Sequence, residues 1–189
     1  MTAQYEFPRR PIQVSDLGGH LQTGFIPLGL SDWLIISSND IPAIAVASKN
    51  GGKLASDTDP SLARVNAATD KKQRIAWASS SSVEIARDLV YPPDLDDAYP
   101  IVFHVLAAMA DVTDTPVLSI GFFEGVGDTN AGGDTAAVTG TAVAEYTVTI
   151  SQVDVGAYPN AVSLSIIPGS HTTDALYVYA TWLTYTRRS

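Results

Sequence analysis

The chain has 189 residues, 46% hydrophobic and 16% charged, which excludes global disorder and suffices for one domain with a sizeable core. Its formal net charge of −9, with basic residues clustered only in three short runs (9–10, 71–74 and 187–188), argues against nucleic acid as a partner. The absence of cysteine excludes disulfides and thiolate metal sites.

Residues 1–27 are expected to form an extended N-terminal arm, followed by a β-sandwich domain over residues 28–189. The first 27 residues contain three prolines and a Gly-Gly pair and keep neither a helical nor a strand period. A disordered tail is the alternative, but apolar and basic side chains favour contact with a partner. The candidate contact residues are Tyr5, Phe7, Arg9, Arg10 and Ile12.

No stretch approaches the roughly 18 apolar residues that cross a bilayer, so a membrane partner is not expected. The N-terminus lacks the apolar region of a secretory signal. The protein is therefore expected to be made in the cytoplasm.

From about residue 30 the chain is predicted to be a series of short strands separated by turn residues. The predicted strands are 33–36, 44–47, 74–78, 83–90, 101–109, 117–124, 145–150, 162–167 and 175–185. No segment has a convincing amphipathic helical pattern. The predicted fold is therefore all-β, an antiparallel β-sandwich of jelly-roll type.

The last predicted strand carries aromatic residues on both faces. Strict alternation over residues 175–185 puts one set on the core face: Leu176, Val178, Ala180 and Trp182. The opposite face then carries Tyr177, Tyr179 and Tyr185. Because one face of a lone sandwich is usually polar and wet, these tyrosines are candidate partner-binding residues. The alternative is a row of tyrosine hydroxyls in water.

Residues 122–138 form the densest run of glycine and acidic residues in the chain. A phosphate loop would need a lysine, which this segment lacks. Asp128, Asn130 and Asp134 offer oxygen ligands for calcium, but Gly132 and Thr139 occupy positions where ligands are required. The preferred interpretation is a long turn between strands, because Gly, Asp and Asn tolerate positive φ.

The sequence lacks a convincing catalytic or metal-binding set. His20, His104 and His171 have no paired metal-ligand spacing, and no Gly-x-Ser-x-Gly elbow occurs. His104 is expected to be a hydrogen-bonded structural residue. Glu124, which follows two phenylalanines, is the one candidate for a buried catalytic acid. The three tryptophans that could form a sugar-binding platform fit core positions better; they are Trp33, Trp77 and Trp182.

Five segments resemble a group of small tailed-phage and prophage virion proteins: 91–97, 104–108, 123–129, 146–150 and 177–185. The resemblance covers roughly residues 90–186. It implies a jelly-roll decoration, or cement, protein that stabilises the outside of a phage capsid as a trimer. The implied partners are the major capsid protein and other copies of the chain, and the implied location is the capsid surface of the virion.

The expected function is therefore structural rather than enzymatic, with no cofactor, no metal and no small-molecule ligand. A phage tail, baseplate or fibre module that binds host glycans is the alternative; it requires a shallow site with exposed tryptophan or tyrosine. An enzyme such as a cell-wall hydrolase is the third hypothesis, and it depends on Glu124.

Overall fold

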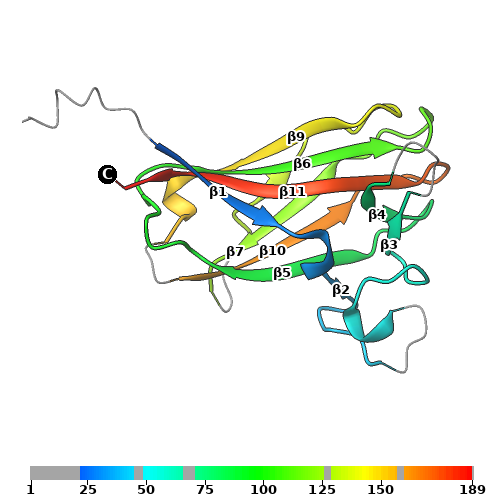
Figure 1. Ribbon diagram of the computed structural model, residues 1–189, viewed down its shortest axis with the longest axis horizontal. Helices are drawn as coiled ribbons and strands as arrows, with labels where there is room; N and C mark the ends of the chain where they lie inside the picture. Colours follow the sequence, from blue (N-terminus) through cyan, green and yellow to red (C-terminus); the bar gives the residue numbers. More distant parts are fainter. Residues whose placement is uncertain (1–21, 45–48, 66–70, 126–128, 157–159, 189) are drawn as a thin grey trace, which may run out of the picture.

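A computed structural model describes residues 22–44, 49–65, 71–125, 129–156 and 160–188 (Figure 1). The described chain is a sandwich of two antiparallel sheets, which confirms the predicted all-β class. Its only helical elements are three-residue 3-10 turns: η2 Leu30–Asp32, η3 Asn50–Gly52 and η4 Gln152–Asp154. The described residues thus include no helix that could span a bilayer.

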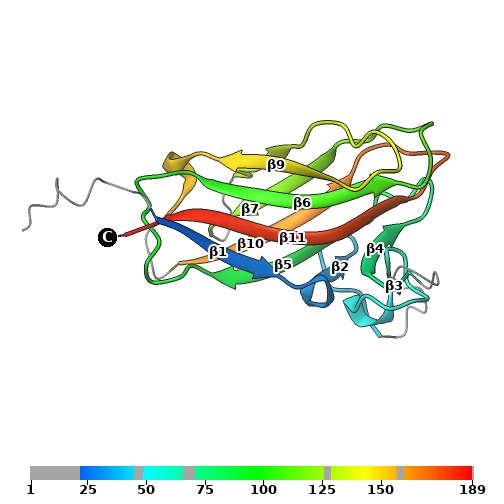
Figure 2. The same cartoon turned by 45° about the horizontal axis from the view of Figure 1, so that its top comes forward.

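Sheet A has the order β3-β4-β11-β6-β9, and β1 also pairs with β11. Its strands are β1 Gln22–Leu28, β3 Ser61–Arg64, β4 Gln73–Trp77, β6 Ile101–Met109, β9 Ala144–Ile150 and β11 Leu176–Arg187. In Figure 2, β1, β11, β6 and β9 lie side by side in the front layer.

Sheet B has the order β2-β5-β10-β7-β8 and forms the second layer. Its strands are β2 Leu34–Ile36, β5 Glu84–Val90, β7 Leu118–Phe123, β8 Gly133–Asp134 and β10 Ala161–Pro168. Most of the strands of both sheets were expected. The predicted strand 44–47 falls mainly on residues 45–48, which lie outside the described residues.

The core lies between the sheets and is filled by the alternate residues of each strand. On β6 the inward set is Ile101, Phe103, Val105, Ala107 and Met109, as the alternation predicts. Trp33 and Trp77 are fully buried, and each indole N–H donates a hydrogen bond, to Thr181 Oγ1 (3.2 Å) and the Val83 carbonyl (2.8 Å). Burying each large side chain contributes about 1.5–3 kcal/mol.

A β-bulge interrupts β11. The pairing of β11 with β6 shifts by one residue between Val178 and Ala180. An extra residue exchanges the two faces of every position that follows it. Leu176 and Val178 therefore point inward before the bulge, whereas Leu183 and Tyr185 point inward after it.

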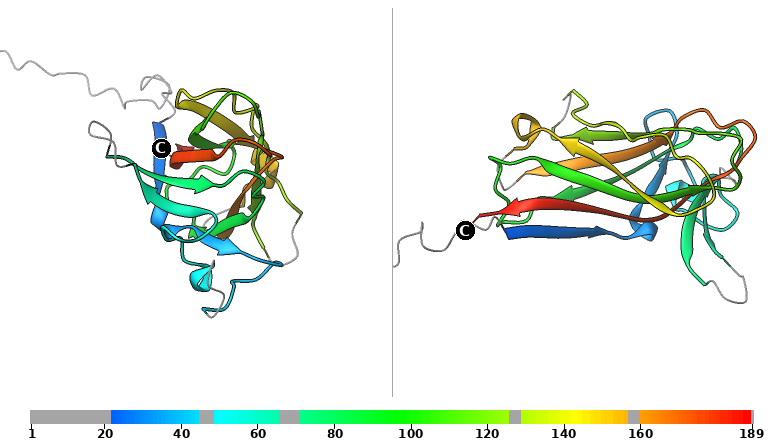
Figure 3. Two further views of the ribbon diagram at one scale, coloured as in Figure 1. Left: turned by 90° about the vertical axis from the view of Figure 1, so that its right-hand side faces the viewer. Right: turned by 90° about the horizontal axis from the view of Figure 1, so that it is seen from above.

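The first strand begins inside the predicted N-terminal arm. Residues 1–21 lie outside the described residues, but residues 22–27 belong to β1, so the sandwich begins at Gln22 and not at residue 28. Gln22 pairs with Arg187, which puts both ends of the described chain at one end of the sandwich (Figure 3). Gly24 is required there, because a Cβ would lie 2.1 Å from the Tyr185 ring.

Two aspartates join the β6–β7 and β10–β11 loops reciprocally. Asp174 Oδ2 accepts the N–H groups of Thr113 (2.8 Å) and Asp114 (3.0 Å). Asp114 Oδ2 accepts those of Thr173 (2.6 Å) and Asp174 (2.8 Å). The N–H groups of Asp174 and Thr173 hold the pKa of the Asp114 carboxyl below its ordinary value, because they favour the charged form.

We expect Asp114→Asn to destabilise the protein at neutral pH and to reduce its loss of stability in acid. A depressed folded-state pKa adds stability that is complete above the ordinary aspartate pKa and is lost as the pH falls below about 4. Urea midpoints at pH 7 and pH 3 measure both effects. Asp57→Asn, at an exposed aspartate, is the control. If the urea midpoints at pH 7 and pH 3 differed by as much in Asp114→Asn as in the wild type, this role of Asp114 would be contradicted.

Candidate binding face

The outer surface of sheet A carries four partly or fully exposed aromatic side chains, here called the aromatic face: Phe25, Tyr177, Tyr179 and Trp182. Phe25 belongs to β1 and is 59% exposed; the other three belong to β11 and are half-buried. Tyr177 precedes the bulge, Tyr179 is the extra residue within it and Trp182 follows it. The bulge thus allows residues of different parity to share one surface.

Trp182 is held in place by its neighbours on both sides. The imidazole of His104, opposite it on β6, stacks on the indole with centroids 4.9 Å apart and planes at 7°. Phe25 on β1 lies 6.4 Å away on the other side. His104 Nδ1 is 2.6 Å from Glu145 Oε1 and Nε2 is 2.8 Å from Thr184 Oγ1, so the predicted structural role of this histidine is confirmed.

Tyr177 is covered on one face by a cation. The guanidinium carbon of Arg74, on β4, lies 3.6 Å from the centre of the Tyr177 ring. The Tyr179 ring stands nearly edge-on to the same ring, with centroids 6.5 Å apart and planes at 73°. Cation–π contact and an edge-to-face aromatic pair both stabilise fixed ring orientations.

Two grooves flank this pair of tyrosines. The larger groove, of about 470 Å³, lies where β1 ends and β4 begins along β11, and Phe25, Tyr179 and Trp182 line it. The smaller groove, of about 300 Å³, has Ser61, Ala63 and Ala76 of β3 and β4 on its surface, beside Arg74 and Tyr177. Small side chains on neighbouring strands make a trough beside the larger aromatic ones.

The predicted partner-binding residues are only partly brought together. Tyr177 and Tyr179 share the outer face as predicted, but the placement of Tyr185 is wrong, because it is 8% exposed and points inward. The core placement of Trp182 is also wrong, whereas those of Trp33 and Trp77 are confirmed. The bulge is the reason for both errors. The predicted arm contacts Tyr5, Phe7, Arg9, Arg10 and Ile12 lie outside the described residues.

Tyr185 has an internal role. Its hydroxyl donates to Asp94 Oδ1 (2.8 Å), and Arg187 Nε donates to Asp94 Oδ2 (2.5 Å). Burial and then the bond to Asp94 raise the pKa of the Tyr185 hydroxyl, whereas the bonds from Tyr185 and Arg187 lower the pKa of Asp94. The proline-rich turn that holds Asp94 is thereby attached to the end of β11.

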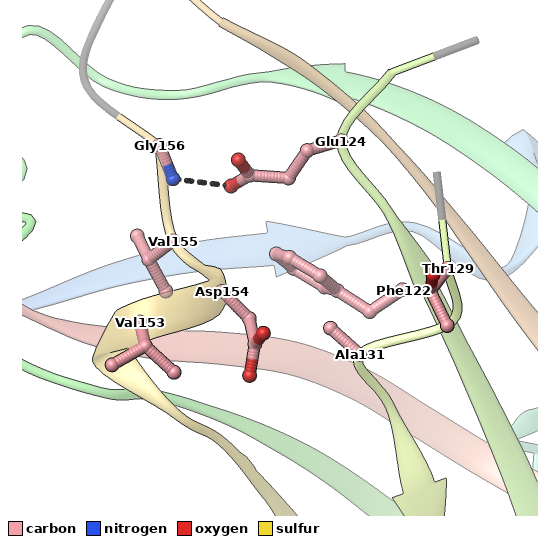
Figure 4. Close-up of a pocket in the computed structure, with 8 residues that line it drawn as sticks. All are labelled: Phe122, Glu124, Thr129, Ala131, Val153, Asp154, Val155 and Gly156. Atoms are coloured by element: carbon pink, nitrogen blue, oxygen red, sulfur yellow. Dashed lines mark hydrogen bonds between the residues drawn. The ribbon is translucent and has the colours of Figure 1, made fainter. Parts of the chain in front are cut away.

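Glu124 lies beside a separate pocket of about 330 Å³ at the end of β7 (Figure 4). Its carboxylate accepts hydrogen bonds from the Tyr91 hydroxyl, the Gly156 N–H (2.6 Å) and the Asn160 side-chain amide (3.2 Å). Burial, then the bond to Glu124, raises the pKa of the Tyr91 hydroxyl. This set of donors joins three loops, so the geometry gives Glu124 a structural role.

The described part of the 122–138 segment is a turn held by side chains. Asn130 Oδ1 accepts the N–H groups of Phe122 (2.9 Å) and Gly132 (2.8 Å), and Asp134 Oδ1 accepts the Ser119 hydroxyl (2.6 Å). Gly132 passes so close to the Ile120 carbonyl that a Cβ would lie 1.9 Å from it. Among the described residues, no group of three His, Asp or Glu side chains could hold a metal ion.

No protein-family model and no curated protein matches the chain. Among solved structures, the xylan-binding module CBM15 is similar with a TM-score of 0.52 at 14% identity, covering 89% of this chain and 100% of that chain. The CBM36-1 domain of a multidomain xylanase from the hindgut metagenome of Trinervitermes trinervoides has a TM-score of 0.49 at 6% identity, covering 89% and 100%. The first likeness establishes the jelly-roll fold and nothing finer.

The outward position of Trp182 predicts that it is the tryptophan most accessible to a collisional quencher. Trp33 and Trp77 are fully buried in the core. We therefore expect Trp182→Phe to remove most of the acrylamide quenching of tryptophan fluorescence, and Trp77→Phe to leave it. Equal quenching of the wild type and Trp182→Phe would contradict the register of β11 after the bulge.

Proposed function

We propose that the chain is a non-catalytic glycan-binding domain that holds an oligosaccharide along the aromatic face of sheet A. The observation that carries this proposal is the four aromatic side chains on one exposed sheet surface, beside two grooves. A sugar ring has apolar C–H faces and a polar hydroxyl rim. Aromatic rings with a few fixed hydrogen-bonding groups match both parts.

The larger groove supplies the aromatic contacts and the polar groups beside it supply orientation. His104 occupies the β6 side of the Trp182 indole, so the other side of the ring lies towards β1 and the larger groove. The Glu145 carboxylate and the Thr184 hydroxyl, which bind His104, lie on the same sheet surface. Because the histidine fixes the indole, little side-chain entropy is lost when a ligand binds.

The fold is compatible with this proposal without deciding it, since jelly rolls include lectin domains and function resides in the site. The structure with a TM-score of 0.52 is a xylan-binding module, which makes xylo-oligosaccharides the first ligands to test. The donors around Glu124 favour a structural role for this residue, which was the one candidate catalytic acid.

Removing a central aromatic ring should weaken glycan binding about tenfold or more, since such anchors carry most of the binding free energy. Trp182→Ala and Tyr179→Ala are the variants, and isothermal titration with ligands selected on a glycan array is the measurement. Tyr99→Ala removes an exposed tyrosine outside the aromatic face and should bind normally. Binding that both face variants retain would refute the site.

The capsid role that the sequence resemblance implies remains a second proposal, and it makes a different demand on the same surface. Phe25 is 59% exposed, which suits a contact between copies of the chain as well as a sugar. In a trimer the aromatic face would be covered, whereas a glycan site must stay open.

Light scattering separates the two proposals. For a glycan-binding domain we expect the mass of one 20.0 kDa chain at low and high concentration. A trimer that Phe25→Ser dissociates, with no glycan bound by either form, would favour assembly on a capsid and overturn the glycan proposal.

A further inference from the structure

We propose that the oligosaccharide bound by the aromatic face carries a carboxylate and that Arg74 receives it. This inference rests on the glycan-binding function proposed above and specifies its ligand as an acidic sugar, of the uronic or sialic acid class. It is carried by the position of Arg74, by its missing partner and by the charge of the surface around it.

Arg74 lies beside the tyrosine pair that separates the two grooves. It lines the smaller groove, and its guanidinium lies on Tyr177, whose neighbour Tyr179 lines the larger groove. The ring contact occupies one flat side of the guanidinium. Its terminal N–H groups lie in the plane of the group, where a ligand in the smaller groove can accept from them.

The guanidinium has no anionic partner among the described residues. The four salt bridges in this part of the molecule use Arg87, His104, Arg187 and Arg188. The Arg74 Nε atom is buried and donates no hydrogen bond. Because protein atoms cover this nitrogen, a ligand carboxylate would be received by the two terminal nitrogens of the guanidinium.

The nearest acidic groups on this surface have other partners. Asp59 lines the smaller groove with Arg74 but forms no salt bridge with it, and its Oδ1 accepts the Ala78 N–H at 3.4 Å. Glu145 is bound to His104 on the far side of Trp182. Neither carboxylate forms a salt bridge with Arg74.

The basic run over residues 71–74 leads into β4 beside the two grooves. Lys72 lines the larger groove and Arg74 lines the smaller one, within a chain whose net charge is −9. A cationic site on an acidic protein attracts an anionic ligand, whereas the negative charge of the rest of the surface repels it. Nucleic acid is not the expected ligand of this run, because the chain as a whole is acidic.

A carboxylate fits this position better than a neutral hydroxyl. The planar carboxylate can accept two parallel N–H bonds from one edge of a guanidinium, and such charge-assisted pairs are roughly twice as strong as neutral hydrogen bonds. A neutral sugar hydroxyl in the same place would accept a weaker hydrogen bond, because it carries no charge. The expected ligand is thus a short sugar chain whose rings lie on the aromatic face and whose carboxylate lies beside Arg74.

The test compares matched oligosaccharides that differ only in charge. One array at low salt presents unbranched xylo-oligosaccharides beside the same chains with a glucuronic acid branch. It also presents other neutral oligosaccharides beside their sialylated and sulfated forms. We expect each carboxylate-bearing member to bind about tenfold more tightly than its neutral partner, a preference that decreases as salt screens the charge.

Variants assign that preference to Arg74. Arg74→Gln should abolish the preference for the carboxylate-bearing members, whereas Arg74→Lys, which keeps the charge without the planar edge, should retain a part of it. Lys53→Gln removes the same charge beside β2 of the other sheet and should change nothing. Thermal unfolding of each variant checks that the fold is retained.

The outcomes separate this inference from the function on which it rests. Equal binding of neutral and carboxylate members, a preference that survives in Arg74→Gln, or selection of sulfated members alone would overturn the role of Arg74 and keep the glycan site. Binding of no array member would overturn both proposals.

Discussion

The bulge between Val178 and Ala180 in β11 is the constraint on which the outer surface of sheet A depends. The extra residue, Tyr179, lets the same strand direct Tyr177 outward before the bulge and Trp182 outward after it, while Leu183 and Tyr185 turn into the core. Without that residue Trp182 and Tyr185 would exchange faces, and an indole would replace a hydrogen-bonded phenol in the interior. The cost of an irregular ladder is offset by a fully packed core on both sides of it.

The bulge also divides the neighbours of β11. One edge of the strand pairs with β4 from Leu176 to Val178 and with β1 from Thr181 to Arg187, and the larger groove lies where neither pairs. Thr181 closes the inner side of this gap, because its hydroxyl accepts from the Trp33 indole and donates to the Leu28 carbonyl at 2.9 Å. The larger groove is therefore a gap in the pairing along one edge of β11. The polar group beneath it, the Thr181 hydroxyl, is buried and has its hydrogen bonds satisfied.

Sequence patterns predicted the sandwich and most strands because alternation in β6, β9 and β10 is regular. They missed β1, where Gly24 and Pro27 resemble loop residues; the glycine gives room to the Tyr185 ring, and the proline is tolerated because β1 pairs on one side only. They also put Trp182 on the wrong face of β11. Strict alternation assumes that every residue is paired, and the sequence does not reveal where a bulge adds one. The role of Arg74 depends on a contact between β4 and β11 that spacing along the chain does not reveal.

The pairing of Gln22 with Arg187 has a consequence for engineering. Because paired backbones are about 5 Å apart, the sandwich can be inserted into a surface loop of a host protein with little strain on either junction. In such a graft β3 and β4 would point away from the host, since they lie at the opposite end of the long axis from the chain terminus (Figure 1). The smaller groove would then lie towards the end of the fusion away from its anchor.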